Sequence, residues 1–260
     1  YMVYMCKKLI FSAFVSSALL WASCSSSHRI VGFERSRILI DSSYDKTADK
    51  EIAAFMAPYK QHVDSIMSPV VGTAAEYLYA ERPESNLSNL LSDILVWCGK
   101  DYGERPDFAV YNIGGMRSAF AKGDITYGDV LDVAPFENKI CFVTLTGDKV
   151  MELFGQIAAS RGEGVSHGVE LVITEDGRLK SALLHGRRIV ADAKYRIATL
   201  DYLAQGNDKL EAFKASTDVK SPSSDENNVR FIIMKYMKEK RQKGESVGSQ
   251  VEGRIKIEGR

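Results

Sequence analysis

Apolar side chains recur at helical spacing in two stretches near the start of the chain. In the first, which begins at Thr47, they are Ile52, Phe55, Met56, Tyr59, Val63, Ile66 and Met67. In the second they are Leu87, Leu90, Leu91, Ile94, Leu95 and Cys98. This spacing predicts two amphipathic helices, the first ended by Pro69 and the second capped by Ser85 or Asn86.

Shorter apolar runs predict strands along much of the remaining chain. They lie at residues 107–112, 139–146, 168–174, 179–185, 186–190, 194–204 and 253–257, after an extended segment at 69–79. Asp176 and Gly177 predict a hairpin whose sheet continues through 186–190 and 194–204. Helices are expected at 147–160 and 229–240. Because runs of strands mix with separated helices, we predict an α+β fold, a single domain with a mixed β-sheet flanked by helices.

The first 23 residues have the pattern of a secretion signal. Two lysines precede an apolar stretch at 9–21, which is shorter than the roughly 20 residues of a membrane-spanning helix. Residues 20–24, LWASC, resemble a bacterial lipobox, in which the cysteine becomes the lipidated first residue. We therefore expect a lipoprotein signal at 1–23, a lipid anchor at Cys24, a tether at 24–46 and a folded domain at 47–260, held at the bacterial cell envelope. An ordinary cleaved signal with an incidental cysteine is the alternative.

The charge balance narrows the range of partners. The sequence holds 34 basic and 34 acidic side chains and has a formal net charge of zero. Proteins that follow nucleic-acid phosphates carry clustered positive charge, so we expect no nucleic-acid partner. Cys98 and Cys141 lie in apolar surroundings and are expected to be buried and unpaired, with a disulfide as the alternative.

The stretch YNIGGMRSAF at 111–120 places an amide, two adjacent glycines and a guanidinium around one bend. These residues are Asn112, Gly114, Gly115 and Arg117. Paired glycines most often mark a tight turn. The functional interpretation is that a ligand approaches the bare backbone, while the amide and the planar guanidinium offer hydrogen bonds to it.

Two aromatic residues lie beside polar ones at the ends of apolar segments. Phe136 precedes Asn138 in APFEN, and Tyr202 precedes Asp208 in DYLAQGND. Packing in the core would by itself account for Phe136, and a turn would by itself account for Asp208. Alternatively, two aromatic rings at strand ends hold a flat ring between them, and the carboxylate accepts hydrogen bonds from sugar hydroxyls.

Taken in order, four motifs resemble the C-terminal, nucleotide-binding domain of the 5'-nucleotidase family, which includes periplasmic UDP-sugar hydrolases and ecto-5'-nucleotidases. They are N-x-G-G-x-R at 112–117, G-D-I-T at 123–126, P-F-x-N at 135–138 and L-T-G at 145–147. The resemblance spans about residues 50–257 and implies a domain that clamps the nucleoside part of a nucleotide. It implies ligand contacts at Arg82, Asn112, Gly114, Gly115, Arg117, Phe136, Asn138, Gly164, Tyr202 and Asp208.

The sequence departs from the family pattern at one of these positions and in the loop around another. Tyr202 stands where the family has a stacking phenylalanine, which keeps the aromatic face and adds a hydroxyl. The family motif G-G-D-G-[FY] reads GNDKL at 206–210, so Asn207, Lys209 and Leu210 replace its expected residues around Asp208.

Catalysis in this family needs a metallophosphoesterase domain, whose D-x-H, G-N-H-[DE] and G-H-x-H clusters hold two metal ions. The four histidines here match none of these clusters, and they are His28, His62, His167 and His185. We therefore predict no catalytic residue, metal site or cofactor in this chain.

The leading hypothesis is the nucleotide-binding half of a 5'-nucleotidase-type hydrolase of nucleotide catabolism. The two divalent metals are then expected on a separate metallophosphoesterase polypeptide. The alternatives are a stand-alone nucleotide- or nucleoside-binding envelope lipoprotein, and a degenerate scaffold that has lost its ligand.

Overall fold

The computed structural model describes residues 29–39, 41–47 and 49–259. The predicted signal at 1–23 and the predicted anchor Cys24 lie outside these residues. Contacts divide the chain into two units, residues 1–53 and 54–260. The first unit contains a 3-10 helix, η1 (Ser42–Thr47), and the start of helix α2 (Lys50–Met67). Within the described residues, no helix is both long and apolar enough to cross a membrane.

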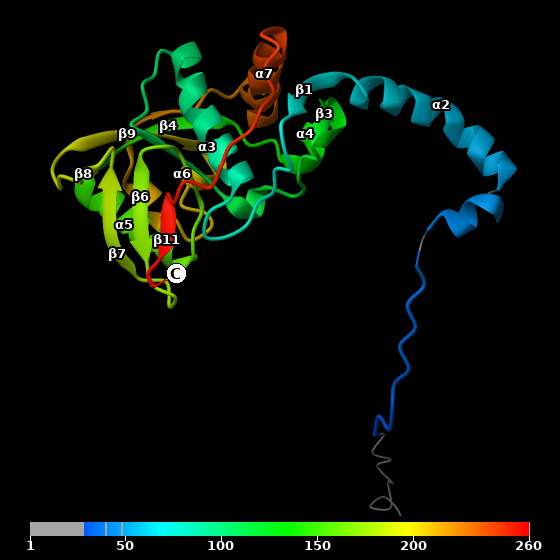
Figure 1. Ribbon diagram of the computed structural model, residues 1–260, viewed down its shortest axis with the longest axis horizontal. Coiled ribbons are helices and arrows are strands. Elements are labelled where there is room, and N and C mark those ends of the chain that lie inside the picture. The colour runs from blue at the N-terminus through cyan, green and yellow to red at the C-terminus, as the bar shows by residue number, and fades with distance from the viewer. Residues whose placement is uncertain (1–28, 40, 48, 260) are drawn as a thin grey trace, which may run out of the picture. The chain divides into compact units, whose positions relative to one another are not determined.

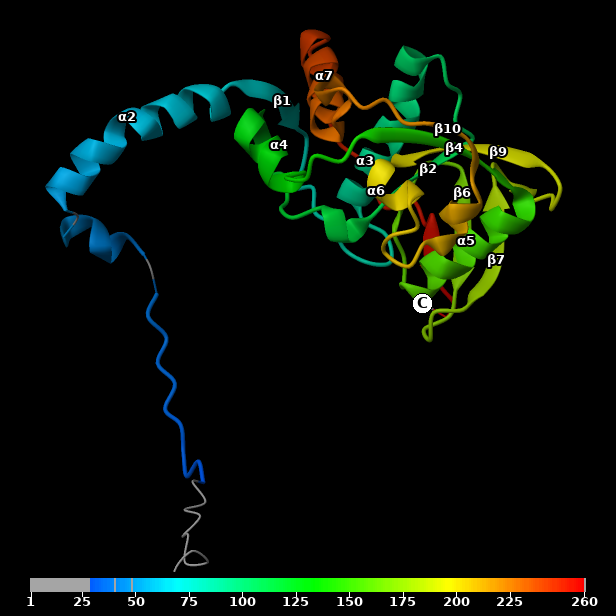
Figure 2. The same ribbon diagram turned by 180° about the vertical axis from the view of Figure 1, so that it is seen from behind.

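A five-stranded mixed sheet lies at the centre of the second unit. Its strands, in the order β10–β4–β9–β2–β5, are β10 (Thr217–Lys220), β4 (Ile140–Thr146), β9 (Lys194–Leu200), β2 (Phe108–Tyr111) and β5 (Gly164–Val165). β9 is antiparallel to β4 and parallel to β2, and Figures 1 and 2 show β4 and β9 side by side from opposite directions. β2 is buried along its whole length, as an apolar run covered on both faces should be.

The other strands of this unit form two smaller sheets. β6 (Val169–Ile173) and β7 (Leu179–Leu184) form the predicted hairpin, and β8 (Arg187–Arg188) pairs with β7. β11 (Ile255–Ile257) runs parallel to β6, so that β7, β6 and β11 lie side by side near the C-terminus in Figure 1. β1 (Val70–Ala74) pairs antiparallel with β3 (Gly123–Thr126).

The prediction that residues 194–204 continue the sheet of the hairpin is wrong. β9 instead joins the five-stranded sheet, and the chain then enters a short helix, α6 (Asp201–Ala204). An apolar strand pattern reports that a strand is buried, but it carries no information about which neighbour supplies its hydrogen bonds.

Three longer helices pack around these sheets. α3 (Asn86–Cys98) contacts β2 and β5, and α5 (Gly147–Ala159) contacts β4 and β7. α7 (Val229–Gln242) contacts β1 and α3. Shorter helical segments connect the strands: η2 (Gly99–Tyr102), η3 (Ile113–Gly115), α4 (Tyr127–Val133), η4 (Glu211–Ala215) and η5 (Asp225–Asn227).

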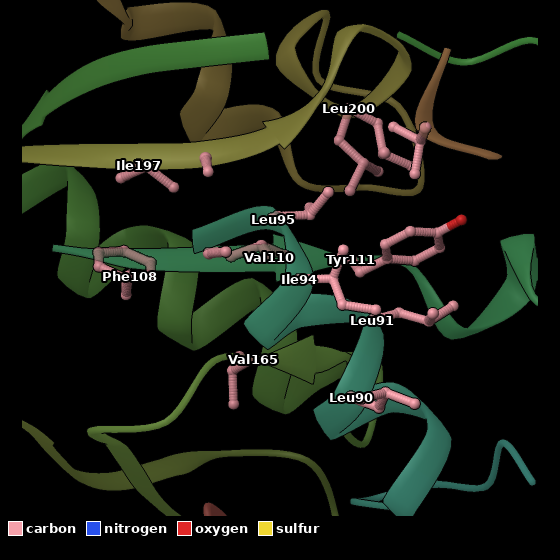
Figure 3. Packing of buried hydrophobic residues seen from close by; sticks show 14 of the residues in the cluster. Leu90, Leu91, Ile94, Leu95, Phe108, Val110, Tyr111, Val165, Ile197 and Leu200 are labelled. Carbon is pink, nitrogen blue, oxygen red and sulfur yellow. The ribbon is translucent and has the colours of Figure 1, made fainter. Parts of the chain in front are cut away.

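Part of the core lies where α3 meets the five-stranded sheet. Figure 3 shows side chains of α3, including Leu91 and Ile94, beside Val110 and Tyr111 of β2. Cys98 and Cys141 are both buried free thiols, which confirms the expectation for them, and burial raises the pKa of Cys98 to about 12. The fold is therefore α+β, with mixed sheets flanked by helices, as the sequence predicts.

Candidate functional site

Three strand ends meet at one edge of the five-stranded sheet. Because β2 runs parallel to β9, the residues after Tyr111 and after Leu200 leave the sheet at the same edge. β4 is antiparallel to β9 and pairs Ile140 with Leu200, so the residues just before β4 reach that edge too. The strand register therefore gathers three segments that lie far apart in the sequence, at 112–117, 135–139 and 201–208.

The first segment is the 3-10 turn η3 and its flanks. Asn112 is 5% exposed, and its Oδ1 has no hydrogen-bond donor among the described residues. A Cβ at Gly115 would lie 2.6 Å from that oxygen, whereas Gly114 faces open space. Gly115 is thus required for the close fit of the Asn112 side chain. Arg117 is exposed and donates from Nη1 to the Gly114 carbonyl at 3.3 Å.

The second and third segments carry the aromatic residues. Phe136 is 48% exposed and Tyr202 is 37% exposed, so both rings remain accessible. Asp201 joins the two segments, because its Oδ1 accepts from the Lys139 amide at 2.9 Å and the Tyr202 amide at 2.8 Å. Arg230 of α7 donates to the Pro135 carbonyl at 2.7 Å and fixes the segment before Phe136. Neither Asp201 nor Arg230 had a sequence signal of its own.

Asp208 connects the amide side of the site to the aromatic side. Its Oδ2 accepts from Asn112 Nδ2 at 2.6 Å, and its Oδ1 accepts from the Tyr202 hydroxyl at 2.9 Å. The hydrogen bond to this carboxylate raises the pKa of Tyr202. Asp208 and Lys209 both have left-handed backbones, with φ of 54° and 63°. A non-glycine residue adopts this conformation at an energetic cost, which the hydrogen bonds of Asp208 offset.

These segments enclose a cavity of about 300 Å³. Eight of the ten residues predicted to contact a ligand line it: Asn112, Gly114, Gly115, Arg117, Phe136, Asn138, Tyr202 and Asp208. The lining combines two aromatic faces with two amides, one guanidinium and one carboxylate. Such a cavity can hold a flat ring between the aromatic residues and offers hydrogen bonds to its polar substituents.

The other two predicted residues, Gly164 and Arg82, lie outside this lining. Gly164 is buried in β5, where a Cβ would lie 2.7 Å from Ser92 Oγ and 2.9 Å from the Tyr111 carbonyl. Close packing of β5 on its neighbours therefore explains this glycine. Arg82 pairs with Glu163 and donates from Nε to the Ser160 carbonyl at 2.8 Å. Its guanidinium is engaged away from the cavity.

The part of the chain that the structure describes contains no group of three or more histidine, cysteine, aspartate or glutamate side chains placed to hold a metal ion. No chemical step through a metal ion is therefore derived for these residues.

The family model for the 5'-nucleotidase C-terminal domain matches residues 70–215. The 5'-nucleotidase of Vibrio parahaemolyticus is 27% identical over 171 residues, which cover 62% of this chain and 30% of that protein. A cell wall protein of Listeria monocytogenes is 26% identical over 233 residues, which cover 80% of this chain and 29% of that protein. The chain thus spans about 30% of the length of these relatives.

Solved structures agree with this match. The 5'-nucleotidase precursor of Thermus thermophilus superposes with a TM-score of 0.69 at 25% identity, covering 83% of this chain and 45% of that one. The cavity lining, the fold and the match at residues 70–215 lead to one conclusion: the chain belongs to the 5'-nucleotidase C-terminal domain family.

Proposed function

We propose that this chain is the nucleotide-binding half of a 5'-nucleotidase-type hydrolase. The observation that carries the proposal is the cavity of about 300 Å³, which lies in the size range of small-molecule pockets. In this proposal Phe136 and Tyr202 stack on the base and Asp208 accepts hydrogen bonds from the ribose. Asn112, Asn138 and Arg117 supply further polar contacts, and the unpartnered Oδ1 of Asn112 is available to a ligand donor.

We propose that a metallophosphoesterase domain distinct from this one brings two divalent metals and is the catalytic partner. Its motivation is that the histidines of this sequence match no family metal cluster. We also propose that Cys24 is lipidated and anchors the protein at the bacterial cell envelope, in keeping with the cell wall protein among its relatives. Intact mass of membrane-extracted protein would show a diacyl or triacyl addition on Cys24, and an unmodified N-terminus at another residue would refute the anchor.

Calorimetric titration with adenosine, AMP and UMP tests the binding role. Stacking of one base on one aromatic side chain contributes about 1–3 kcal/mol, so Phe136→Ala should weaken binding about 5- to 150-fold. Tyr202→Ala should weaken it nearly as much, whereas Tyr202→Phe keeps the aromatic face, loses only the hydrogen bond to Asp208 and should weaken binding less. Arg117→Ala should weaken binding without unfolding the domain.

The same titrations separate the alternatives. Wild-type protein that is folded but binds none of the three ligands at millimolar concentration would favour the degenerate scaffold, whose support is the altered loop at 206–210. Binding without any metallophosphoesterase partner in the producing organism would favour a stand-alone binding protein. Nucleotide hydrolysis by the purified chain, abolished by a substitution within it, would contradict the division of labour proposed above.

A further inference from the structure

Behind the cavity, a buried carboxylate touches the turn that carries the two glycines. Glu163 is 2% exposed and lies just before β5. Its Oε2 accepts a hydrogen bond from the backbone amide of Ile113 at 2.6 Å. Ile113 is the first residue of η3 and directly follows Asn112. This bond therefore fixes the peptide unit that joins the cavity amide to the glycine turn.

The other oxygen of Glu163 is held by Arg82. The Arg82 guanidinium pairs with Oε1 from Nη2, and its Nε donates to the Ser160 carbonyl at the end of α5. Burial raises the pKa of Glu163, while the Ile113 amide and the Arg82 charge act in the opposite direction. Both carboxylate oxygens thus have a strong donor, and one of these donors belongs to the cavity turn.

The backbone around this pair has little room to move. Gly162 has φ of 110°, and a Cβ there would lie 2.3 Å from the Pro83 carbonyl. The turn at 161–164 therefore presses directly on the residue after Arg82. Because Gly164 is also packed against the β2 backbone, Glu163 is held in place from both sides.

We infer that Glu163 is a positioning residue for ligand binding, and that Arg82 acts through it rather than on the ligand. The pair sets the orientation of the Asn112–Ile113 peptide and so the geometry of the cavity amide. This inference rests on the proposed function, since it concerns binding in the same cavity. It gives Glu163, which the sequence did not indicate, a role in ligand binding. It also changes the role of Arg82 from a direct ligand contact to a support of Glu163.

The test is a double-mutant cycle on adenosine and AMP affinity, with Glu163→Gln, Arg82→Met and the combined variant. Gln can still accept from the Ile113 amide, but its amide nitrogen cannot accept from Arg82. Glu163→Gln should weaken binding about tenfold, and Arg82→Met should weaken it by a smaller factor. The combined variant should lose no more than Glu163→Gln alone, because both changes act through one contact. Glu170→Gln, at an exposed position of β6, is the matched control and should bind as the wild type does.

A second readout separates positioning from mere stability. In two-dimensional ¹H–¹⁵N spectra of ligand-free protein, the Ile113 amide proton should shift upfield in Glu163→Gln, while amides of β10, at the opposite edge of the five-stranded sheet from β5, stay in place. If Glu163→Gln does not fold, the Ile113 amide shift can be measured in Arg82→Met instead. The Arg82 side chain is 35% exposed, so its replacement should leave the domain folded.

The possible outcomes distinguish the two proposals. Wild-type protein that binds neither probe would overturn the proposed function and this inference together. Wild-type binding with equal affinity in a folded Glu163→Gln or Arg82→Met variant would overturn this inference alone.

Discussion

Helices α3 and α2 both carry apolar residues at helical spacing, yet they differ completely in burial. Ten of the 13 residues of α3 are buried, and they include Leu87, Leu91, Ile94 and Leu95. None of the 18 residues of α2 is buried, and Phe55, Tyr59 and Ile66 are between 45% and 66% exposed. Apolar spacing thus predicted both helices, but it did not predict which apolar face would have a protein surface to cover it.

The sharpest test of this difference is the same substitution in both helices. Ile94→Ala in α3 removes a fully buried side chain and should lower the free energy of unfolding by about 2–5 kcal/mol. Ile66→Ala in α2 removes a side chain that is 45% exposed and should change it by no more than about 0.5 kcal/mol. Chemical denaturation of both variants measures the effects. A loss of several kcal/mol in Ile66→Ala would show that the α2 face is covered in solution.

An ion pair beyond the end of α3 should matter more than one on α2. Glu104 is 16% exposed and receives a hydrogen bond from Arg196 at 2.8 Å. That hydrogen bond is the main reason why the pKa of Glu104 lies below its usual value of 4.5. The stability it contributes is therefore complete above pH 4.5 and is lost as the pH falls through the lowered pKa.

Glu104→Gln should accordingly cost about 1–3 kcal/mol at neutral pH and flatten the decline of stability below pH 4.5. Thermal melts between pH 2.5 and 7 measure both effects. If the stability of the variant declines below pH 4.5 as steeply as that of the wild type, other carboxylates cause the acid sensitivity.

The N-terminal caps of the two helices offer a smaller contrast. Ser85 and Ser88 form a capping box on α3, whereas the Asp49 carboxylate caps the exposed α2 by accepting from the Glu51 and Ile52 amides. Ser85→Ala should lower the free energy of unfolding by about 0.5–2 kcal/mol. Asp49→Ala should leave the melting temperature nearly unchanged and speed amide hydrogen exchange within α2 only. Equal effects on the melting temperature would contradict the contrast.

The smallest expected effect is on the surface of α2. Lys60 and Asp64 form a 2.6 Å ion pair in which both side chains are more than half exposed. Asp64→Asn should change the free energy of unfolding by less than about 0.5 kcal/mol, and added salt should reduce the difference further. A larger, salt-resistant loss would indicate a partner for this helix face.

The cavity shows how much of the functional prediction could be made from local sequence. The glycine turn and the two aromatic residues were identified from their positions at the ends of apolar runs, and the family resemblance supplied their order. Glu163 and Asp201 were missed because each acts through backbone amides of segments far away in the chain. No spacing or composition at residues 161–164 or 200–202 marks such a contact.

Arg82 shows a second limit of prediction from local sequence. It was predicted as a ligand contact from its place before the second helix, but its guanidinium engages Glu163 and the Ser160 carbonyl. A long, flexible side chain can reach either the cavity or its supporting residues from the same backbone position. Local sequence cannot choose between the two.

Periodicity, caps and turn residues are local properties, so they were sufficient to predict the four longest helices, most strands, the hairpin and the α+β class. Burial and membership of the cavity depend on contacts between distant residues. Phe136 and Tyr202 are 66 positions apart in the sequence. They reach the same edge because β4 pairs with β9 in a register that places Ile140 opposite Leu200. That register, like the exposure of α2 among the described residues, depends on how complete elements pack together, and no single stretch of the chain specifies it.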